Sequence, residues 1–276
     1  MKPEFRVQLS FQICRSYRDM LESTRFLEDH GFSAMFRGDH LLPVDDSDDT
    51  ITEAWMSLAG LARETRSIHL GTLVSPVTFR NPGLLARTVA TVHEMSDGRA
   101  EVGMGAGWYV REHDAFGLPL PPWPERFDLL EEQLGIVRAL LTGEHVREKT
   151  AHYSIDATLG PYLGGRRPPP IVVGGNGKPR TISLAARFSD ELNLDQITDV
   201  EAVRFAFARL DADLDAIGRP RDAVVRSNVM PFPDDLGQAA DTISAMQDAG
   251  VHRFYVRRTS AIPLDRLAAF AHRFIA

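Results

Sequence analysis

Asp39 and His40 stand side by side directly after a short apolar run, and this pair could move a proton. Histidine changes its charge near neutral pH, so it serves as a general acid or base. A neighbouring carboxylate would orient the ring, and we take His40 and Asp39 as candidate catalytic residues. The alternative is that Asp39 caps a helix or makes a loop contact and takes no part in chemistry.

The stretch "GMGAGWYVREH", Gly103–His113, holds three glycines at alternate positions. It departs from the dinucleotide-binding pattern G-x-G-x-x-G, because Trp108 occupies the last glycine position and no helix is expected directly after it. Whether Trp108 stacks on a flat cofactor or closes the top of the fold is left open. Glu112 and His113 could be an acid and a base, but we interpret them as a clamp that ties this loop to a neighbouring arginine.

A second glycine-rich stretch, "GGNGKPR" at Gly174–Arg180, leads from an apolar run into an expected helix. Its spacing is wrong for the P-loop of nucleotide hydrolases, because Pro179 follows Lys178 where serine or threonine is required. Exposed backbone N–H groups, a helix N-terminus and the cations Lys178 and Arg180 could instead bind a phosphate. The alternative is a tight turn whose cations are simply solvated.

Apolar runs alternate with amphipathic stretches along the whole chain, which is typical of βα units and a parallel sheet. The expected strands are Phe5–Phe11, Ser33–Phe36, Ile68–Val74, Ala100–Met104, Ile171–Val173, Glu191–Leu194, Val224–Met230 and Arg253–Val256. The expected helices are Tyr17–His30, Glu53–Glu64, Pro82–Met95, Pro124–Leu141, Pro179–Phe188, Val200–Ile217, Leu236–Ala249 and Pro263–Phe274.

Eight such pairs predict an α/β fold of the (β/α)8 TIM-barrel type, with residues 1–276 as a single domain. Two stretches do not fit the repeat. Leu41–Thr50 is acidic and follows a strand, so we interpret it as a lid, and Glu144–Arg167 could hold a pair of strands. In a barrel, the segments that follow the strands gather at one end, where catalytic residues are found. The five segments of interest are Gly38–His40, Ser75–Arg80, Gly103–His113, Gly174–Arg180 and Asn193–Gln196.

Composition and charge narrow the class of ligand. The formal net charge is −7 and lysine and arginine form no cluster, which disfavours nucleic acid and acidic membranes and favours a small-molecule substrate. No secretory signal and no long apolar span are evident, so we expect a cytoplasmic protein. The single cysteine, Cys14, has no partner for a disulfide, and no histidine lies in an H-E-x-x-H motif, so no metal site is expected.

Several long segments resemble the luciferase-like monooxygenase superfamily, and in particular its branch of oxidoreductases that use the deazaflavin coenzyme F420. They include "GFSAMFRGDHLLP", "TLVSPVTFRNPGLLARTVATVHEMSDGRAEVGMGAGWYVREHDAFG" and "PPPIVVGGNGKPRTISLAARFSDELN". The likeness is strong from about Phe5 to Asn193 and weaker afterwards. It implies a luciferase-like (β/α)8 barrel that binds F420, or alternatively FMN, at the carboxyl ends of its strands, often as a homodimer.

The resemblance also implies roles for residues. Asp39 and His40 would lie beside the ring of the cofactor, and the stretch Leu73–Pro76 would form a bulge behind that ring. The family often has a cis peptide bond in this bulge. Because proline favours the cis form more than other residues do, we expect the cis bond between Ser75 and Pro76. With the glycine turn described above, the candidate cofactor-binding residues are Leu73, Val74, Ser75, Gly105, Ala106, Gly107, Trp108, Gly174, Gly175, Asn176, Gly177, Lys178 and Arg180. Arg166, Arg167 and Arg180 are candidates for the polyanionic tail of F420.

The expected activity is hydride transfer between C5 of the deazaflavin and a small organic substrate, with His40 polarising or protonating that substrate. The alternatives are an FMN-dependent monooxygenase that uses reduced flavin and O2, and a protein that binds flavin without turnover. The resemblance has two gaps. Sugar-phosphate dehydrogenases of this family carry a catalytic glutamate near the position of Ala106 and a tryptophan near that of Val44, and this sequence has neither.

Overall fold

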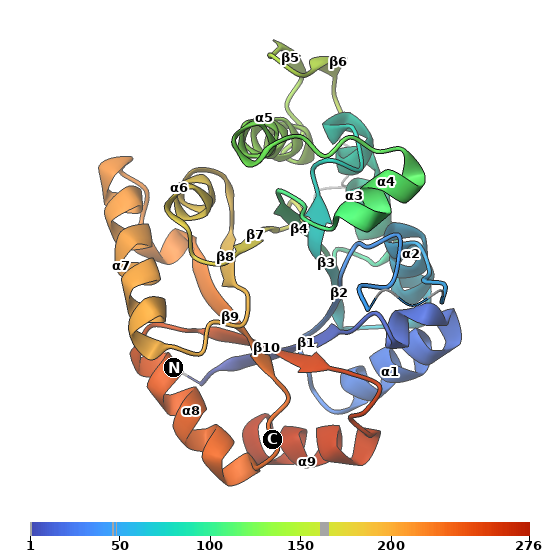
Figure 1. Cartoon of the computed structure of the whole chain (residues 1–276), viewed down its shortest axis with the longest axis vertical. Helices are drawn as coiled ribbons and strands as arrows, with labels where there is room; N and C mark the ends of the chain where they lie inside the picture. The colour runs from blue at the N-terminus through green and yellow to red at the C-terminus, as the bar shows by residue number, and fades with distance from the viewer. Residues whose placement is uncertain (1, 46, 48, 161–165) are drawn as a thin grey trace.

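A computed structural model describes residues 2–45, 47, 49–160 and 166–276 of the chain. Eight parallel strands close into a barrel in the order β1-β10-β9-β8-β7-β4-β3-β2, as Figure 1 shows in a view along the barrel. The barrel strands are β1 (Glu4–Leu9), β2 (Ala34–Arg37), β3 (His69–Pro76), β4 (Ala100–Gly105), β7 (Ile171–Gly175), β8 (Glu191–Leu194), β9 (Val225–Pro231) and β10 (Arg253–Arg258). The predicted TIM barrel and all eight of its strands are confirmed.

Helices surround the barrel and connect its strands. They are α1 (Tyr17–Asp29), α2 (Ala54–Glu64), α3 (Pro82–Met95), α4 (Val110–Phe116), α5 (Trp123–Leu141), α6 (Pro179–Phe188), α7 (Val200–Ala216), α8 (Leu236–Asp248) and α9 (Leu264–Phe274). All eight predicted helices are confirmed. The expectation that no helix follows the Gly103–Trp108 loop directly is wrong, because α4 begins at Val110. Its seven residues are too few to show a helical repeat of apolar residues.

Local chemistry explains where several helices begin and end. The side chain of Asn81 accepts a hydrogen bond from the backbone N–H of Gly83 at the start of α3, and Pro82 occupies the first turn. Asp199 caps α7 and Asp235 caps α8 in the same way. Gly117 follows α4 with a φ of 63°, the left-handed conformation that glycine adopts readily at a helix end.

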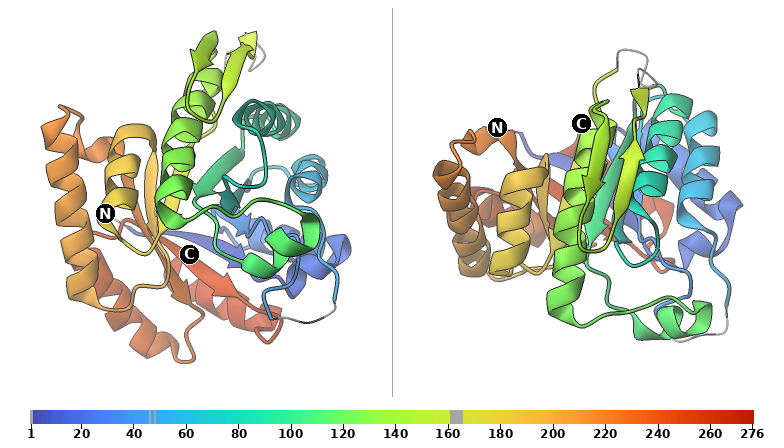
Figure 2. Two further views of the ribbon diagram at one scale, coloured as in Figure 1. Left: turned by 45° about the horizontal axis from the view of Figure 1, so that its top comes forward. Right: turned by 90° about the horizontal axis from the view of Figure 1, so that it is seen from above.

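The predicted strand pair within Glu144–Arg167 is confirmed as an antiparallel hairpin of β5 (Val146–Lys149) and β6 (Ser154–Ala157). It projects from the barrel beyond α5, as the views of Figure 2 show. Residues 161–165 of that insertion lie outside the described residues, as do residues 46 and 48 of the expected lid at Leu41–Thr50. The lid therefore stays a prediction.

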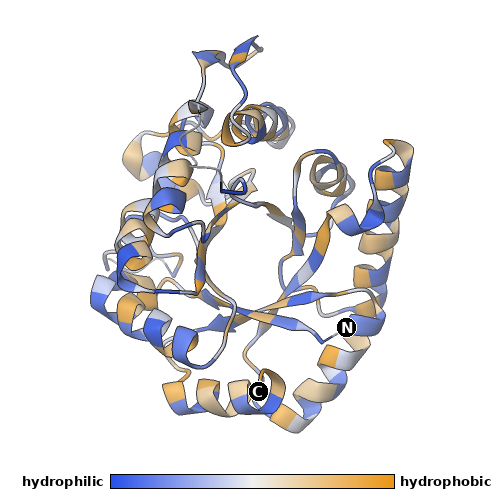
Figure 3. Cartoon of the chain, turned by 180° about the vertical axis from the view of Figure 1, so that it is seen from behind, coloured by the Kyte–Doolittle hydropathy of each residue, from blue (hydrophilic) through white to orange (hydrophobic). Residues whose placement is uncertain are grey.

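Apolar side chains fill part of the barrel interior. Six buried residues form this cluster: Ala34, Phe36, Leu73, Val172, Val229 and Tyr255. Hydrophilic and hydrophobic residues are mixed along the ring of strands, which Figure 3 shows from behind. The outward faces of the strands pack against the helices in a larger apolar cluster. The barrel is thus filled by side chains, as in other TIM barrels.

Charged residues fill the barrel at the amino ends of its strands. Arg6 donates from Nη1 to Oε2 of the buried Glu101 over 2.7 Å. Arg253 pairs with two carboxylates. Its Nε donates to Glu4 over 2.8 Å, and its Nη1 pairs with Glu191. Burying a charge is costly unless it is paired or hydrogen-bonded, and here each arginine faces a carboxylate from another strand.

The same pairing sets the protonation of two carboxyl groups. Burial alone would raise the pKa of Glu4, but Arg6 and Arg253 lower it to about 2. Burial would likewise raise the pKa of Glu101, and Arg6 and His69 hold it well below its usual range. Since both carboxylates bind protons more weakly in the folded state, they stabilise the fold above about pH 4.5, the ordinary pKa of glutamate.

We expect the free energy of unfolding to fall as the pH is lowered from about 4.5 towards 2, because the unfolded chain takes up protons that Glu4 and Glu101 resist in the fold. The measurement is the midpoint of urea denaturation at a series of pH values. The variant Glu4→Gln should show a shallower pH dependence over that range than the unmodified chain. Identical pH dependences for the two proteins would contradict the assignment.

Candidate active site

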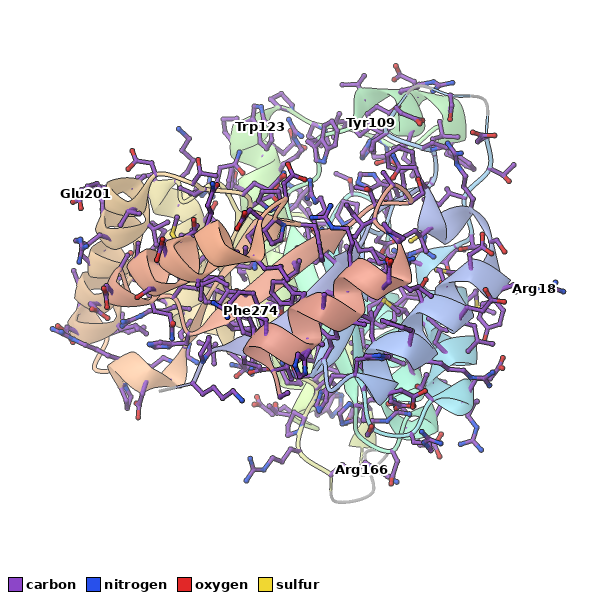
Figure 4. The ribbon with its side chains drawn as sticks, turned by 90° about the horizontal axis from the view of Figure 1, so that it is seen from below. Arg18, Tyr109, Trp123, Arg166, Glu201 and Phe274 are labelled. Carbon is purple, nitrogen blue, oxygen red and sulfur yellow. The ribbon has the colours of Figure 1, made fainter. Side chains whose placement is uncertain are left out.

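The five segments chosen from the sequence follow the carboxyl ends of parallel barrel strands, so they gather at one end of the molecule. Figure 4 shows this end at the top, with Tyr109 and Trp123 at its rim and Arg166 at the opposite end. No described helix is long and apolar enough to cross a membrane. Within the described part of the chain, no three histidine, cysteine, aspartate or glutamate side chains come together to hold a metal ion.

Asp39 is buried and acts as the centre of a polar cluster. Both of its carboxylate oxygens accept from Arg80, over 2.5 and 3.2 Å. Ser75 donates to Asp39 over 2.6 Å and accepts from the indole of Trp55 over 3.1 Å. The bidentate pair and the serine thus engage both carboxylate oxygens. The expectation that Asp39 orients His40 is therefore wrong, because its oxygens face Arg80 and Ser75 instead.

Glu112, from α4, is the residue that orients His40. Its carboxylate lies 3.1 and 3.2 Å from Nδ1 of His40 and accepts from the backbone N–H of Leu41 over 2.9 Å. Glu112 is 1% exposed. The predicted clamp is confirmed as a contact, but its partner is His40 rather than an arginine. Sequence reasoning could not find this pair, because 72 residues separate its members.

The pairing defines what His40 can do. A carboxylate at Nδ1 favours the tautomer that carries a proton there, which leaves Nε2 as the atom that can exchange a proton with a ligand. Nε2 has no hydrogen-bond partner among the described residues, and it is not buried. The arrangement is that of a general acid or base held by a buried carboxylate.

His113 has a different role from His40. Its Nδ1 lies 2.7 Å from the carbonyl oxygen of Tyr109 and its Nε2 lies 2.7 Å from the hydroxyl of Thr78. A carbonyl oxygen only accepts, so Nδ1 donates and Nε2 accepts from the threonine. With both nitrogens occupied and the side chain fully buried, His113 is a support of the loop. The sequence interpretation of His113 as a support is consistent with this geometry.

Trp108 lies at the rim and is 56% exposed. Its ring meets that of His40 edge to face, with 5.9 Å between the centroids. The phenol of Tyr109 donates to the carbonyl oxygen of Pro43 over 3.0 Å and so ties this loop to the one that follows β2. Of the two interpretations left open by the sequence, the exposed position favours a ring that can contact a ligand over a plug.

The bulge in β3 lies at the expected place, but its cis peptide bond joins Leu73 and Val74, not Ser75 and Pro76. The pairing of β3 with β4 shifts register between Thr72 and Ser75. The displaced Val74 side chain occupies the space where neighbouring strands would otherwise carry their own side chains.

Glycines on β4 and β7 accommodate Val74. A Cβ atom on Gly105 would lie 2.5 Å from Cγ2 of Val74, and one on Gly174 would lie 2.7 Å from its Cγ1. Packing therefore explains glycine at these two positions, since any side chain would collide with Val74.

Replacing Gly105 with alanine should destabilise the fold by about 1–3 kcal/mol, because the added methyl group overpacks the bulge. Gly135→Ala is the matched control. Gly135 lies within α5, and its added Cβ would meet only Phe188 at 3.7 Å, so we expect stabilisation of about 0.4–1 kcal/mol. Urea denaturation measures both, and a Gly105→Ala variant as stable as the unmodified chain would contradict the packing argument.

The glycine turn after β7 leaves the start of α6 open. Gly177 has a φ of 67°, Lys178 precedes the helix without making a side-chain cap, and Pro179 begins it. Asn176 and Lys178 are exposed. The first N–H groups of α6 are therefore free to bind an anion, which is the geometry that the sequence suggested. Ligand binding by these residues stays a prediction.

Two of the cations assigned to an anionic ligand have other partners. Arg180 pairs with Asp128 of α5 and donates to the carbonyl oxygen of Pro124 over 3.2 Å. Arg166 pairs with Asp97 over 2.6 Å, and Arg167 accepts through its carbonyl oxygen from His93. Asp97 precedes β4, so Arg166 lies at the amino ends of the strands, opposite the candidate site. The expectation that Arg166 and Arg167 bind the tail of a cofactor there is wrong.

One cation at the carboxyl ends was missed by the sequence. Arg257, on β10, donates to Oε1 of Gln8 over 3.0 Å and to Asp195 over 3.3 Å. Gln8 in turn donates to the carbonyl oxygen of Leu73 over 3.2 Å, at the cis peptide. The expected strand ended at Val256, one residue short, so the position of Arg257 inside the mouth could be recognised only from the closed barrel.

This geometry defines a (β/α)8 barrel with a candidate site at the carboxyl ends of its strands. The family model described as luciferase-like monooxygenase matches residues 4–271, and the chain belongs to that family.

Relatives and solved structures agree with this assignment. An F420-dependent glucose-6-phosphate dehydrogenase from Microbacterium testaceum is 33% identical over 75% of this chain and 61% of its own length. An F420-dependent hydroxymycolic acid dehydrogenase from Mycobacterium tuberculosis is 29% identical over 88% of this chain and 62% of its own length. The chain thus matches about three-fifths of each relative. The solved structure of an F420-dependent secondary alcohol dehydrogenase superimposes on this chain with a TM-score of 0.84 and 19% sequence identity. The superposition includes 100% of this chain and 98% of that protein, which shows that the two share a fold.

Proposed function

We propose that this chain is an F420-dependent oxidoreductase that transfers a hydride between C5 of the deazaflavin and a small organic substrate. The observation that carries the proposal is the His40 ring, held through Nδ1 by the buried Glu112 with Nε2 left for a ligand. The F420-dependent relatives support the choice of cofactor. The deazaflavin, when bound, supplies the hydride chemistry, and the protein supplies orientation and a proton.

The residues present fit such a group. Val74 and the glycines packed against it form an uncharged wall, and Trp108 presents an exposed aromatic ring at the rim. The uncapped start of α6 offers N–H groups to a phosphate. In this proposal Leu73, Val74 and Ser75 back the ring, Gly105–Trp108 border it, and Gly174–Lys178 bind the phosphate.

His40 is the proposed catalytic residue. With Nδ1 protonated and paired to Glu112, its Nε2 would accept a proton from a substrate hydroxyl as hydride leaves the carbon, or return it in the reverse direction. Glu112 is a positioning residue in this scheme, because it contacts the ring and the backbone of Leu41 rather than the substrate. Asp39 holds the segment that follows the carboxyl end of β2 in place, through its hydrogen bonds with Arg80 and Ser75.

The substrate differs from a sugar phosphate in this proposal. Ala106 and Val44 provide neither a carboxyl group nor an indole, so the proton donor and the ring that the resemblance associates with sugar-phosphate dehydrogenases are absent. His40 is then the group left to handle the substrate proton.

Titration of the purified protein with F420 and with FMN, followed by fluorescence quenching, tests the choice of cofactor. We expect micromolar or tighter binding of F420 and no response to FMN at the same concentrations. Tight FMN binding together with oxygen uptake by the reduced flavin would overturn the proposal in favour of a monooxygenase.

Replacing His40 with alanine should reduce turnover by about 10²–10⁴-fold, the usual contribution of a general acid or base, and change the Kd of F420 by no more than about threefold. Turnover is measured as F420 reduction with a panel of secondary alcohols and other small hydroxy compounds. Glu112→Gln should lower kcat less than His40→Ala does, because the amide can still accept hydrogen bonds. Turnover by His40→Ala equal to that of the unmodified protein would refute the assignment.

A further inference from the structure

One turn of the chain contacts both segments that carry the His40–Glu112 pair. The β3–α3 turn, Val77–Arg80, follows the carboxyl end of β3. Its last residue, Arg80, donates to both carboxylate oxygens of Asp39, over 2.5 and 3.2 Å. Asp39 precedes His40 in the chain, so this ion pair fixes the backbone on one side of the pair.

The same turn reaches α4 through Thr78. The hydroxyl of Thr78 donates to Nε2 of His113 over 2.7 Å, and the ring of Phe79 lies 5.2 Å from that of His113 between centroids. His113 follows Glu112 in α4. Because His40 and Glu112 belong to different elements, the distance between them depends on how those elements are held. The β3–α3 turn holds both.

Gln133, on α5, fixes the β3–α3 turn itself. Its Nε2 donates to the carbonyl oxygen of Val77 over 2.7 Å and to that of Arg80 over 3.2 Å. One amide group therefore joins the first and the last residue of the turn. The side chain of Gln133 is fully buried, where hydrogen bonds are not weakened by competition with water.

The amide of Gln133 is placed for its donors. Its Oε1 is buried and has no hydrogen-bond partner among the described residues. A buried acceptor in that state is unfavourable, so the side chain is a poor choice for filling space alone. Its contribution lies in the two N–H groups, which set the direction and spacing of two backbone carbonyl groups.

The hairpin of β5 and β6 contacts Gln133 from the other side. The hydroxyl of Tyr153, in the turn of the hairpin, lies 2.6 Å from Nε2 of Gln133. The neighbouring Glu132 accepts from Thr150 of the same hairpin turn over 2.6 Å. An insertion that lies outside the barrel (Figure 2) is thereby connected to the β3–α3 turn.

We propose that Gln133 is a positioning residue of the candidate active site. By fixing the β3–α3 turn it sets the distance between His40 and Glu112, and Tyr153 supports it in this role. The inference rests on the proposed function, in which His40 exchanges the substrate proton. Misplacing a reacting group by about 1 Å can lower a rate by about a hundredfold, so a remote amide can matter for turnover.

The variant Gln133→Met tests the proposal, because methionine is similar in length and volume but has no N–H group to donate. We expect kcat for F420 reduction to fall by about tenfold or more, and the Kd of F420 to change by no more than about threefold. Tyr153→Phe should lower kcat by a smaller factor, since Gln133 keeps both carbonyl partners. A kcat unchanged by Gln133→Met would overturn the proposal.

The variant Thr65→Val is the matched control for lost stability. It removes a buried hydroxyl that donates to the carbonyl oxygen of Leu61 and accepts from Arg99 over 3.0 Å, ahead of the amino end of β3. It should lower the Tm and leave kcat unchanged. A loss of kcat equal to that of Gln133→Met would mean that turnover only follows stability, which overturns the proposal.

A double-mutant cycle with His40→Ala separates positioning from general support of the fold. In the His40→Ala background, Gln133→Met should lower the Tm as it does alone but cause no further loss of turnover, because the group that it positions is gone. The same factor of loss in both backgrounds would show that Gln133 does not act through His40, and the proposal would fail.

Nitrogen-15 NMR of the histidine rings tests the positioning without a cofactor. The signals of His40 are those missing from the spectrum of His40→Ala. Gln133→Met should shift them, and Thr65→Val should not. If the unmodified protein binds no F420, the proposed function fails, and this measurement then decides about Gln133: His40 signals that stay in place with Gln133→Met overturn its positioning role.

Discussion

Closure of the parallel barrel is the constraint on which the rest of this structure depends. β1 pairs with both β10 and β2, so the first and last strands of the chain are neighbours and all eight carboxyl ends meet at one end. That single fact brings His40, Glu112 and Arg257 to one end of the barrel although they are far apart in sequence. It also separates Arg166 from them, because the insertion that carries it returns to the amino ends of the strands.

Within the mouth, packing and charge explain why particular residue types are present. The β3 bulge places Val74 where β4 and β7 would carry side chains, and glycine is the residue that leaves the space. Several arginines at this end face a carboxylate, as Arg80 does with Asp39 and Arg257 does with Asp195.

Much of the fold could be predicted from local sequence. Apolar runs, proline in first turns and glycine after helix ends located eight strands and eight helices, and α3 and α6 were predicted with the bounds that the structure has. The short α4 was missed, because seven residues show too little of a helical repeat. His40 was found by its position after a strand. Its partner was assigned to the adjacent Asp39, since neighbours in sequence are the only contacts that a linear pattern can suggest.

The sequence by itself determined the barrel, the end of it that carries the candidate site, and the family, because these depend on periodicity, strand order and long ordered motifs. Tertiary structure alone decided which groups satisfy one another: Glu112 rather than Asp39 holds His40, the cis bond precedes Val74, and Arg180 pairs with Asp128. The physical reason is that hydrogen bonds and ion pairs depend on distances of a few ångströms between side chains, and those distances are set only when the barrel closes.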